Sequence, residues 1–283
     1  MWTAPCSCAR LNSLAKGKSA TMLTADLDDI RLHYRIDGPE DGTPVVFANS
    51  LGTDLRLWDK VIARMPKTGL KYIRYDTRGH GLSDGTPPPY GMGTLVRDAE
   101  RLMDNLGVRD AVFVGLSIGG MTAQGLAAKR LDLVRALVLS NTAARIATRE
   151  IWAQRIADVE TGGVEALADA TMLRWFTPAF RATDEFRIWR NMMLRTSVDG
   201  YIGCSHAIAG TDFYTTTAAL RLPTLGIAGS EDGSTPPDLV RETSNLVPGS
   251  QFHLIRKAGH LPCVEAPDEY ARVLSEFIAA QAH

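Results

Sequence analysis

Residues 112–124 read VFVGLSIGGMTAQ and place Ser117 between Gly115 and Gly119, in the pattern G-x-S-x-G. The apolar run before the serine predicts a buried strand, and the small residues after it predict a helix. A serine at such a turn lies on a sharp, strained bend that exposes its hydroxyl. A side chain at either flanking glycine would collide with neighbouring backbone. A glycine-rich turn without chemistry would give the same pattern, so the rest of the chain has to supply partners for the serine.

Short apolar runs alternate with longer amphipathic stretches on both sides of this turn. Strands are predicted at 30–36, 44–49, 71–76, 111–115, 134–141, 222–229 and 251–257, and helices at 94–107, 119–131, 236–245 and 267–280. Strands that are apolar and alternate with helices indicate a mostly parallel sheet with helices on both faces. Residues 143–211 look helical throughout. The sequence therefore predicts one α/β domain, 22–142 and 212–283, with a helical cap, 143–211, inserted between two strands.

Composition excludes several classes of partner. The 283 residues carry a net charge of -1, so nothing points to nucleic acid or an anionic membrane surface. No apolar run approaches the roughly 18 residues needed to span a membrane. Cys6, Cys8, Cys204 and Cys263 show neither metal-ligand spacing nor a disulfide framework. This cysteine usage favours a reducing, cytoplasmic setting.

The first 21 residues differ from the rest of the chain. They carry Arg10, Lys16 and Lys18 and contain no acidic residue, which weakly resembles an organelle transit peptide. Because a persuasive amphipathic arginine pattern is missing, we favour Met22 as the natural beginning. We expect residues 1–21 to be a disordered extension outside the fold.

A serine nucleophile needs a base and an acid that orients the base. Among the six histidines, His260 in RKAGHLPCVEAP stands just after a predicted strand and downstream of any acid. The others are less suitable, because His33 and His80 precede the serine, His206 falls in the cap, His253 lies within a strand and His283 ends the chain. We therefore expect His260 to be the base, against the alternative of a surface histidine beside a turn.

The acid is expected just after the strand at 222–229, where Glu231 and Asp232 stand in GSEDGSTPP. An Asp at this position could also cap the following helix. The oxyanion of an acyl-transfer reaction would need two backbone N–H donors. Ile118, the residue after the serine, would supply one, and Leu51 in the loop NSLGTD would supply the other.

With these residues assembled, the chain from about 24 to 278 resembles the α/β-hydrolase superfamily, of which YDTRGHGLSD is a familiar mark. The family pattern favours Asp232 over Glu231. The segments FANSLGTDLRLWD, GLSIGGMTAQ, SNTAARIATREIWAQRI and IAGSEDGSTPP are similar to the 3-oxoadipate enol-lactonases. In those enzymes the usual His-Gly pair of the oxyanion loop is replaced by Asn-Ser, here Asn49 and Ser50.

This resemblance implies hydrolysis of a small anionic enol-lactone to 3-oxoadipate in the beta-ketoadipate pathway of aromatic catabolism, with no metal or organic cofactor. The substrate carboxylate would need a cationic partner, and Trp152 and Arg155 lie three residues apart on a predicted cap helix. His206 is a further candidate for substrate binding. Ordinary cap packing is the alternative for each of these residues. A carboxylesterase or another lactonase would use the same triad, whereas a non-catalytic ligand receptor would not need it intact.

Overall fold

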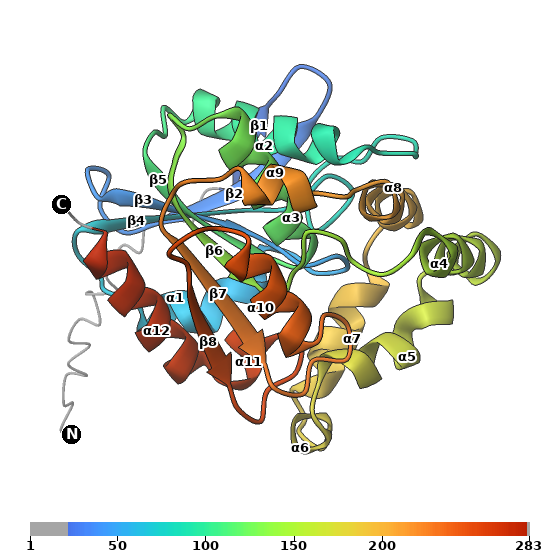
Figure 1. The fold of residues 1–283 in the computed structure, drawn as a ribbon. Coiled ribbons are helices and arrows are strands. Elements are labelled where there is room, and N and C mark those ends of the chain that lie inside the picture. The colour runs from blue at the N-terminus through green and yellow to red at the C-terminus, as the bar shows by residue number, and fades with distance from the viewer. Residues whose placement is uncertain (1–21, 282–283) are drawn as a thin grey trace, which may run out of the picture.

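The computed structural model describes residues 22–281, so the expectation for residues 1–21 lies outside the described residues. Within the described range, one eight-stranded sheet has the order β1-β2-β4-β3-β5-β6-β7-β8 (Figure 1). The strands are β1 (Leu23–Asp26), β2 (Arg31–Asp37), β3 (Thr43–Ala48), β4 (Leu70–Tyr75), β5 (Ala111–Leu116), β6 (Val134–Ser140), β7 (Thr224–Gly229) and β8 (Gln251–Ile255). β1 and β2 are antiparallel to their neighbours, and the six strands β3 to β8 pair in parallel with one another.

Helices cover both faces of this sheet, as the apolar strands predicted. α2 (Met92–Asn105) and α3 (Ile118–Lys129) pack together on one side with α9 (Tyr214–Ala218) (Figure 1). α1 (Asp59–Arg64), α11 (Pro262–Glu265) and α12 (Pro267–Ala280) pack together on the other side. α10 (Pro237–Asn245) packs against β7, and a 3-10 helix (Leu55–Trp58) precedes α1. No helix within residues 22–281 is both long and apolar enough to cross a membrane.

The chain between β6 and β7 forms a separate group of helices beside the sheet (Figure 1). These are α4 (Arg149–Gly162), α5 (Glu165–Trp175), α6 (Pro178–Arg181), α7 (Phe186–Leu194) and α8 (Val198–Ala209), which we call the cap. Trp152, Trp175 and Trp189 are buried within it. The cap interrupts the alternation of strands and helices where the sequence predicted an inserted helical region.

β1 is one of the short elements that the sequence pattern missed. β1 pairs with β2 and buries Ala25, although no strand was predicted before residue 30. An edge strand of four residues is too short to show a clear alternation of apolar and polar side chains.

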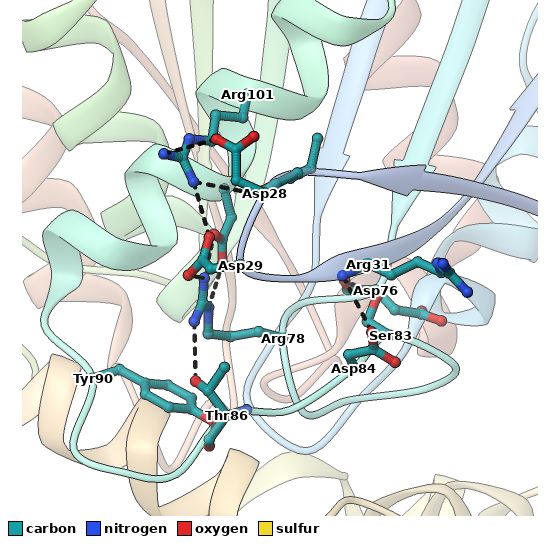
Figure 2. Close-up of polar contacts among 12 residues, drawn as sticks. Asp28, Asp29, Arg31, Asp76, Arg78, Ser83, Asp84, Thr86, Tyr90 and Arg101 are labelled. Atoms are coloured by element: carbon teal, nitrogen blue, oxygen red, sulfur yellow. Dashed lines mark hydrogen bonds and ion pairs between the residues drawn. The ribbon is translucent and has the colours of Figure 1, made fainter.

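The loop after β4 is fastened to α2 and to the turn between β1 and β2. Arg78 reaches Asp29 and Thr86, and Arg101 of α2 reaches Asp28 and Asp29 (Figure 2). Arg78 also forms a two-pronged ion pair with the buried Asp98 of α2. These contacts fix the loop that contains His80, and the His80 side chain contacts the segment after β3.

Candidate active site

Ser117 stands at the turn between β5 and α3, with backbone angles φ 58° and ψ -117°. A residue other than glycine rarely adopts such a positive φ, so the turn stores strain. A Cβ added at Gly115 would lie 2.2 Å from the carbonyl oxygen of Gly119, and one at Gly119 would lie 2.4 Å from that of Ala48. The predicted reason for both glycines is confirmed, because α3 begins directly against the backbone at the end of β3.

His260 and Asp232 are brought together from the loops after β8 and β7. The Nδ1 atom of His260 lies 2.9 Å from Oδ2 of Asp232, and both residues are buried. The carboxylate fixes the orientation of the ring, so Nε2 is the nitrogen left for chemistry. Sequence order suggested His260 and an acid after β7, the family resemblance favoured Asp232, and the structure places the two side chains in direct contact.

Asp232 is held by more donors than His260 alone. Its Oδ1 accepts from the backbone N–H groups of Ser234 and Thr235 at 2.7 and 3.0 Å. Its Oδ2 accepts from the Asn141 side-chain amide and the Thr235 hydroxyl. Burial by itself would raise the pKa of Asp232, but His260 and the hydrogen bonds outweigh burial and lower the pKa. Asp232 therefore stays ionised beside His260 and also caps the following turn.

The loop after β3 lies next to the start of α3 and offers backbone donors. Within residues 22–281, the N–H groups of Leu51 and Ile118 donate to no other protein atom. Gly52 has φ +79°, and its N–H donates to Nε2 of the buried His80 at 3.0 Å. Because Nδ1 of His80 lies 3.1 Å from the Arg78 carbonyl, this imidazole is neutral and braces the loop. Burial lowers the pKa of His80, in agreement with that role.

A cavity of about 50 Å³ joins these groups. Ser117, His260 and Leu51 all line it, together with the predicted cap residues Trp152 and Arg155. The remaining lining side chains come from the cap and from the loops after β3, β6 and β7: Ser50, Ile146, Ala147, Thr171, Arg174, Trp175, Tyr201, Ile208, Ser234 and Thr235. The cavity therefore places the Ser117 hydroxyl, the His260 imidazole and two arginines within one small space.

The expectation for His206 is wrong. His206 is exposed and lines two surface grooves, away from the cavity that holds Ser117. Tyr201 and Ile208 of the same helix, α8, are seven residues apart and face the cavity. A position five residues after Tyr201 is turned by about 140° around a helix, because each residue adds about 100°. His206 consequently points to the other side of α8.

Arg174 is a site residue that the sequence reasoning missed. Its Nη2 donates to Thr171 at 2.9 Å, while its buried Nε has no hydrogen-bond partner among the described residues. Burial, and then the nearby charge of Arg155, lower the pKa of the Arg174 guanidinium. Arg155 itself stacks 4.7 Å from the Trp152 ring. In residues 22–281 neither arginine has a carboxylate partner, so the pair is suited to bind an anion.

The end of α5 ties the cap to the loops of the acid and the base. The carbonyl of Arg174 accepts from Gly233 N–H at 3.1 Å, and that of Trp175 accepts from His260 N–H at 2.8 Å. The Trp175 ring also stacks on the His260 imidazole, with centroids 6.2 Å apart. The cap thus helps to hold the base in place as well as covering the cavity.

Comparison with known proteins agrees with this geometry. Residues 43–267 match the family model described as alpha/beta hydrolase fold. The chain is 32% identical to 3-oxoadipate enol-lactonase 1 of Acinetobacter baylyi, over 87% of this chain and 92% of that protein. It is also similar to the crystal structure of the enol-lactonase from Burkholderia xenovorans, with 35% identity, a TM-score of 0.87 and coverage of 91% and 100%. A thermophilic esterase from Thermogutta terrifontis superposes with a TM-score of 0.85 at 27% identity, covering 93% of this chain and 98% of the esterase.

The matched region contains β3 to α11 and every residue of the cavity described above. We conclude that the chain belongs to the α/β-hydrolase family and, within it, resembles the 3-oxoadipate enol-lactonases.

Proposed function

We propose that this protein hydrolyses 3-oxoadipate enol-lactone to 3-oxoadipate, in the beta-ketoadipate pathway, by acyl-enzyme chemistry on Ser117. The observation that carries the proposal is the cavity lined by Ser117, by His260 with Asp232 on its Nδ1, and by two arginines without carboxylate partners among the described residues. The reaction type follows from the serine and its partners, and the anionic substrate follows from the arginines.

In the first half of the reaction, His260 Nε2 removes the proton of the Ser117 hydroxyl as its oxygen attacks the lactone carbonyl. The developing oxyanion is received by the N–H groups of Leu51 and Ile118, each worth about 3–4 kcal/mol in the transition state. Collapse breaks the ring C–O bond. The leaving group departs as an enolate, which takes the proton held by His260 and becomes the ketone, so the imidazole is neutral again for the second half.

In the second half, His260 removes a proton from water as the water oxygen attacks the acyl carbon. The bond to Ser117 then breaks, and Ser117 recovers its proton from His260. During both steps the acetate carboxylate of the substrate is bound by Arg155 and Arg174, with Trp152 holding Arg155 by cation–π contact.

The test offers the purified protein the enol-lactone and follows the loss of its absorbance. We expect Ser117→Ala to lower kcat by about four orders of magnitude or more, as in other serine hydrolases that lose the nucleophile. Full activity of Ser117→Ala would contradict the assignment of the nucleophile. If simple aryl esters turn over much faster than the lactone, the protein is a serine esterase and the lactone is not its substrate.

A further inference from the structure

The Ser50 hydroxyl lies close to the His260 nitrogen that is left for chemistry. The Oγ atom of Ser50 is 3.4 Å from Nε2 of His260, and Ser50 is only 3% exposed. Ser50 lines the same cavity as Ser117 and stands directly before Leu51 in the loop after β3. Ser50 and Ser117 therefore come from different loops and line one cavity with His260, and Ser50 Oγ lies within 3.4 Å of the imidazole Nε2.

The position of Ser50 is fixed by its neighbours in the chain. The Asn49 side chain donates to the Tyr75 carbonyl at 2.8 Å and accepts from the Trp58 indole at 2.9 Å. The carbonyl of Ser50 accepts from both the N–H and the hydroxyl of Thr53. The loop is thus anchored on both sides of Ser50, and the Oγ atom is held at the cavity wall.

The two halves of the proposed reaction place different groups beside His260 Nε2. During acylation the Ser117 hydroxyl is the group that His260 must deprotonate. During deacylation the Ser117 oxygen is esterified, and a water molecule must take its place at Nε2. An oxygen can stand about 2.8 Å from both Ser50 Oγ and His260 Nε2, because these two atoms are closer together than twice that length.

We propose that Ser50 is a catalytic residue of the deacylation half-reaction, where its hydroxyl positions the attacking water. Ser50 Oγ accepts a hydrogen bond from one O–H of the water, and His260 Nε2 takes the proton of the other. The water oxygen then forms its bond to the acyl carbon, and the Ser117 Oγ–acyl bond breaks as His260 returns the proton to Ser117. Ser50 forms no covalent bond and ends the cycle unchanged. This assignment rests on the proposed acyl-enzyme function.

The test measures the two half-reactions separately with p-nitrophenyl acetate. Stopped-flow release of p-nitrophenol gives the acylation rate, and acid-quenched samples give the fraction of acetylated protein by intact mass. In Ser50→Ala we expect deacylation to slow by about tenfold, the effect of one lost hydrogen bond, with acylation changed by less than about twofold. The acetylated fraction at steady state should rise accordingly.

Ser244→Ala is the matched control, because Ser244 is equally buried but its hydroxyl donates to the Val240 carbonyl in α10, away from the cavity. This control should leave both rates unchanged. Equal losses in acylation and deacylation in Ser50→Ala, or no change in either, would overturn the role of Ser50. Acetylation of Ser117→Ala to the same extent as the wild type, or full turnover of the ester by Ser117→Ala, would instead refute the acyl-enzyme function and the Ser50 assignment with it.

Discussion

The two arginines of the cavity differ in how they are held. Arg155 is supported by the Trp152 ring, whereas Arg174 has a buried Nε without a partner in the described chain. A substrate carboxylate would satisfy that N–H and relieve the repulsion between the two charges. Since a charged hydrogen bond contributes about 1.5–3 kcal/mol, Arg174→Gln should raise KM for the carboxylate-bearing lactone by about 10- to 100-fold. Its kcat/KM for the neutral p-nitrophenyl acetate should change little.

Steady-state kinetics on both substrates tests this prediction, with Arg190→Gln as the matched control. Arg190 is also a cap arginine, but it pairs with Glu165 and Asp169 at the surface. A parallel loss of activity on the charged and the neutral substrate would mean that Arg174 supports the cap and does not bind the carboxylate.

The roles of site residues that belong to a sequence pattern could be predicted from the sequence. The roles of residues that depend on their three-dimensional surroundings could not. Ser117, Asp232 and His260 each follow a strand, in an order that points to one edge of the sheet. Nothing in the sequence distinguishes Arg174 from other cap arginines, because its role depends on the missing partner of its Nε. Asn141 follows β6 and donates to Asp232 at 2.8 Å, a role that depends on the packing of two loops and that no sequence pattern marks.

At the scale of elements, the junction between α5 and the His260 loop is closed by one carboxylate. Oε1 of Glu265 accepts from the N–H and the hydroxyl of Thr177, just after α5, and Oε2 accepts from Gly259 N–H at 2.6 Å. Glu265 thus joins the cap to the residue before His260. Burial raises the pKa of Glu265, and the hydrogen bonds from Thr177 and Gly259 oppose that rise.

Glu265→Gln should weaken this junction, because the amide nitrogen of glutamine cannot accept one of the three hydrogen bonds. We expect the free energy of unfolding to fall by about 1–3 kcal/mol, the cost of an unsatisfied buried donor. At temperatures where the variant is folded, kcat should fall while KM changes little, since the cavity lining is intact. Urea titration and steady-state kinetics measure both effects. Glu269 lies on α12 and, within residues 22–281, pairs only with His253 of β8. Glu269→Gln should therefore leave both the free energy of unfolding and kcat nearly unchanged.

The elements themselves were predictable where a periodic pattern was long enough. The parallel strands and α2, α3, α10 and α12 lie within a few residues of their predicted ranges. Short elements such as β1, α1 and α11 were missed because four to six residues carry too little periodicity. The cap was predicted as helical, but the way α5 contacts His260 depends on tertiary packing that no local pattern encodes.

At the scale of the whole molecule, the cap is joined to the sheet domain at several separate places. Besides the Glu265 junction, the Ser197 hydroxyl donates to the Gly79 carbonyl at 2.9 Å, and Gly200 and Gly79 are in backbone contact. Lys60 of α1 pairs with Glu185 before α7 at 2.6 Å. Much of the cap interior also belongs to the same continuous apolar core as the strands. Such contacts favour cooperative unfolding of the cap with the sheet.

We therefore expect cap and sheet to unfold in a single transition in urea. Trp152, Trp175 and Trp189 lie in the cap, so a variant with Trp2→Phe and Trp58→Phe reports cap unfolding by tryptophan fluorescence. Far-UV circular dichroism of the same variant reports unfolding of the whole molecule. Because both midpoints are measured on one protein, any stability lost through the substitutions affects both and does not bias their comparison. The two midpoints should coincide, because loss of the cap would leave Glu265, the Gly79 carbonyl and the apolar surface of the sheet domain without their partners. A fluorescence midpoint at clearly lower urea than the dichroism midpoint would show that the cap opens independently, and the base would then lose its α5 support before the sheet unfolds.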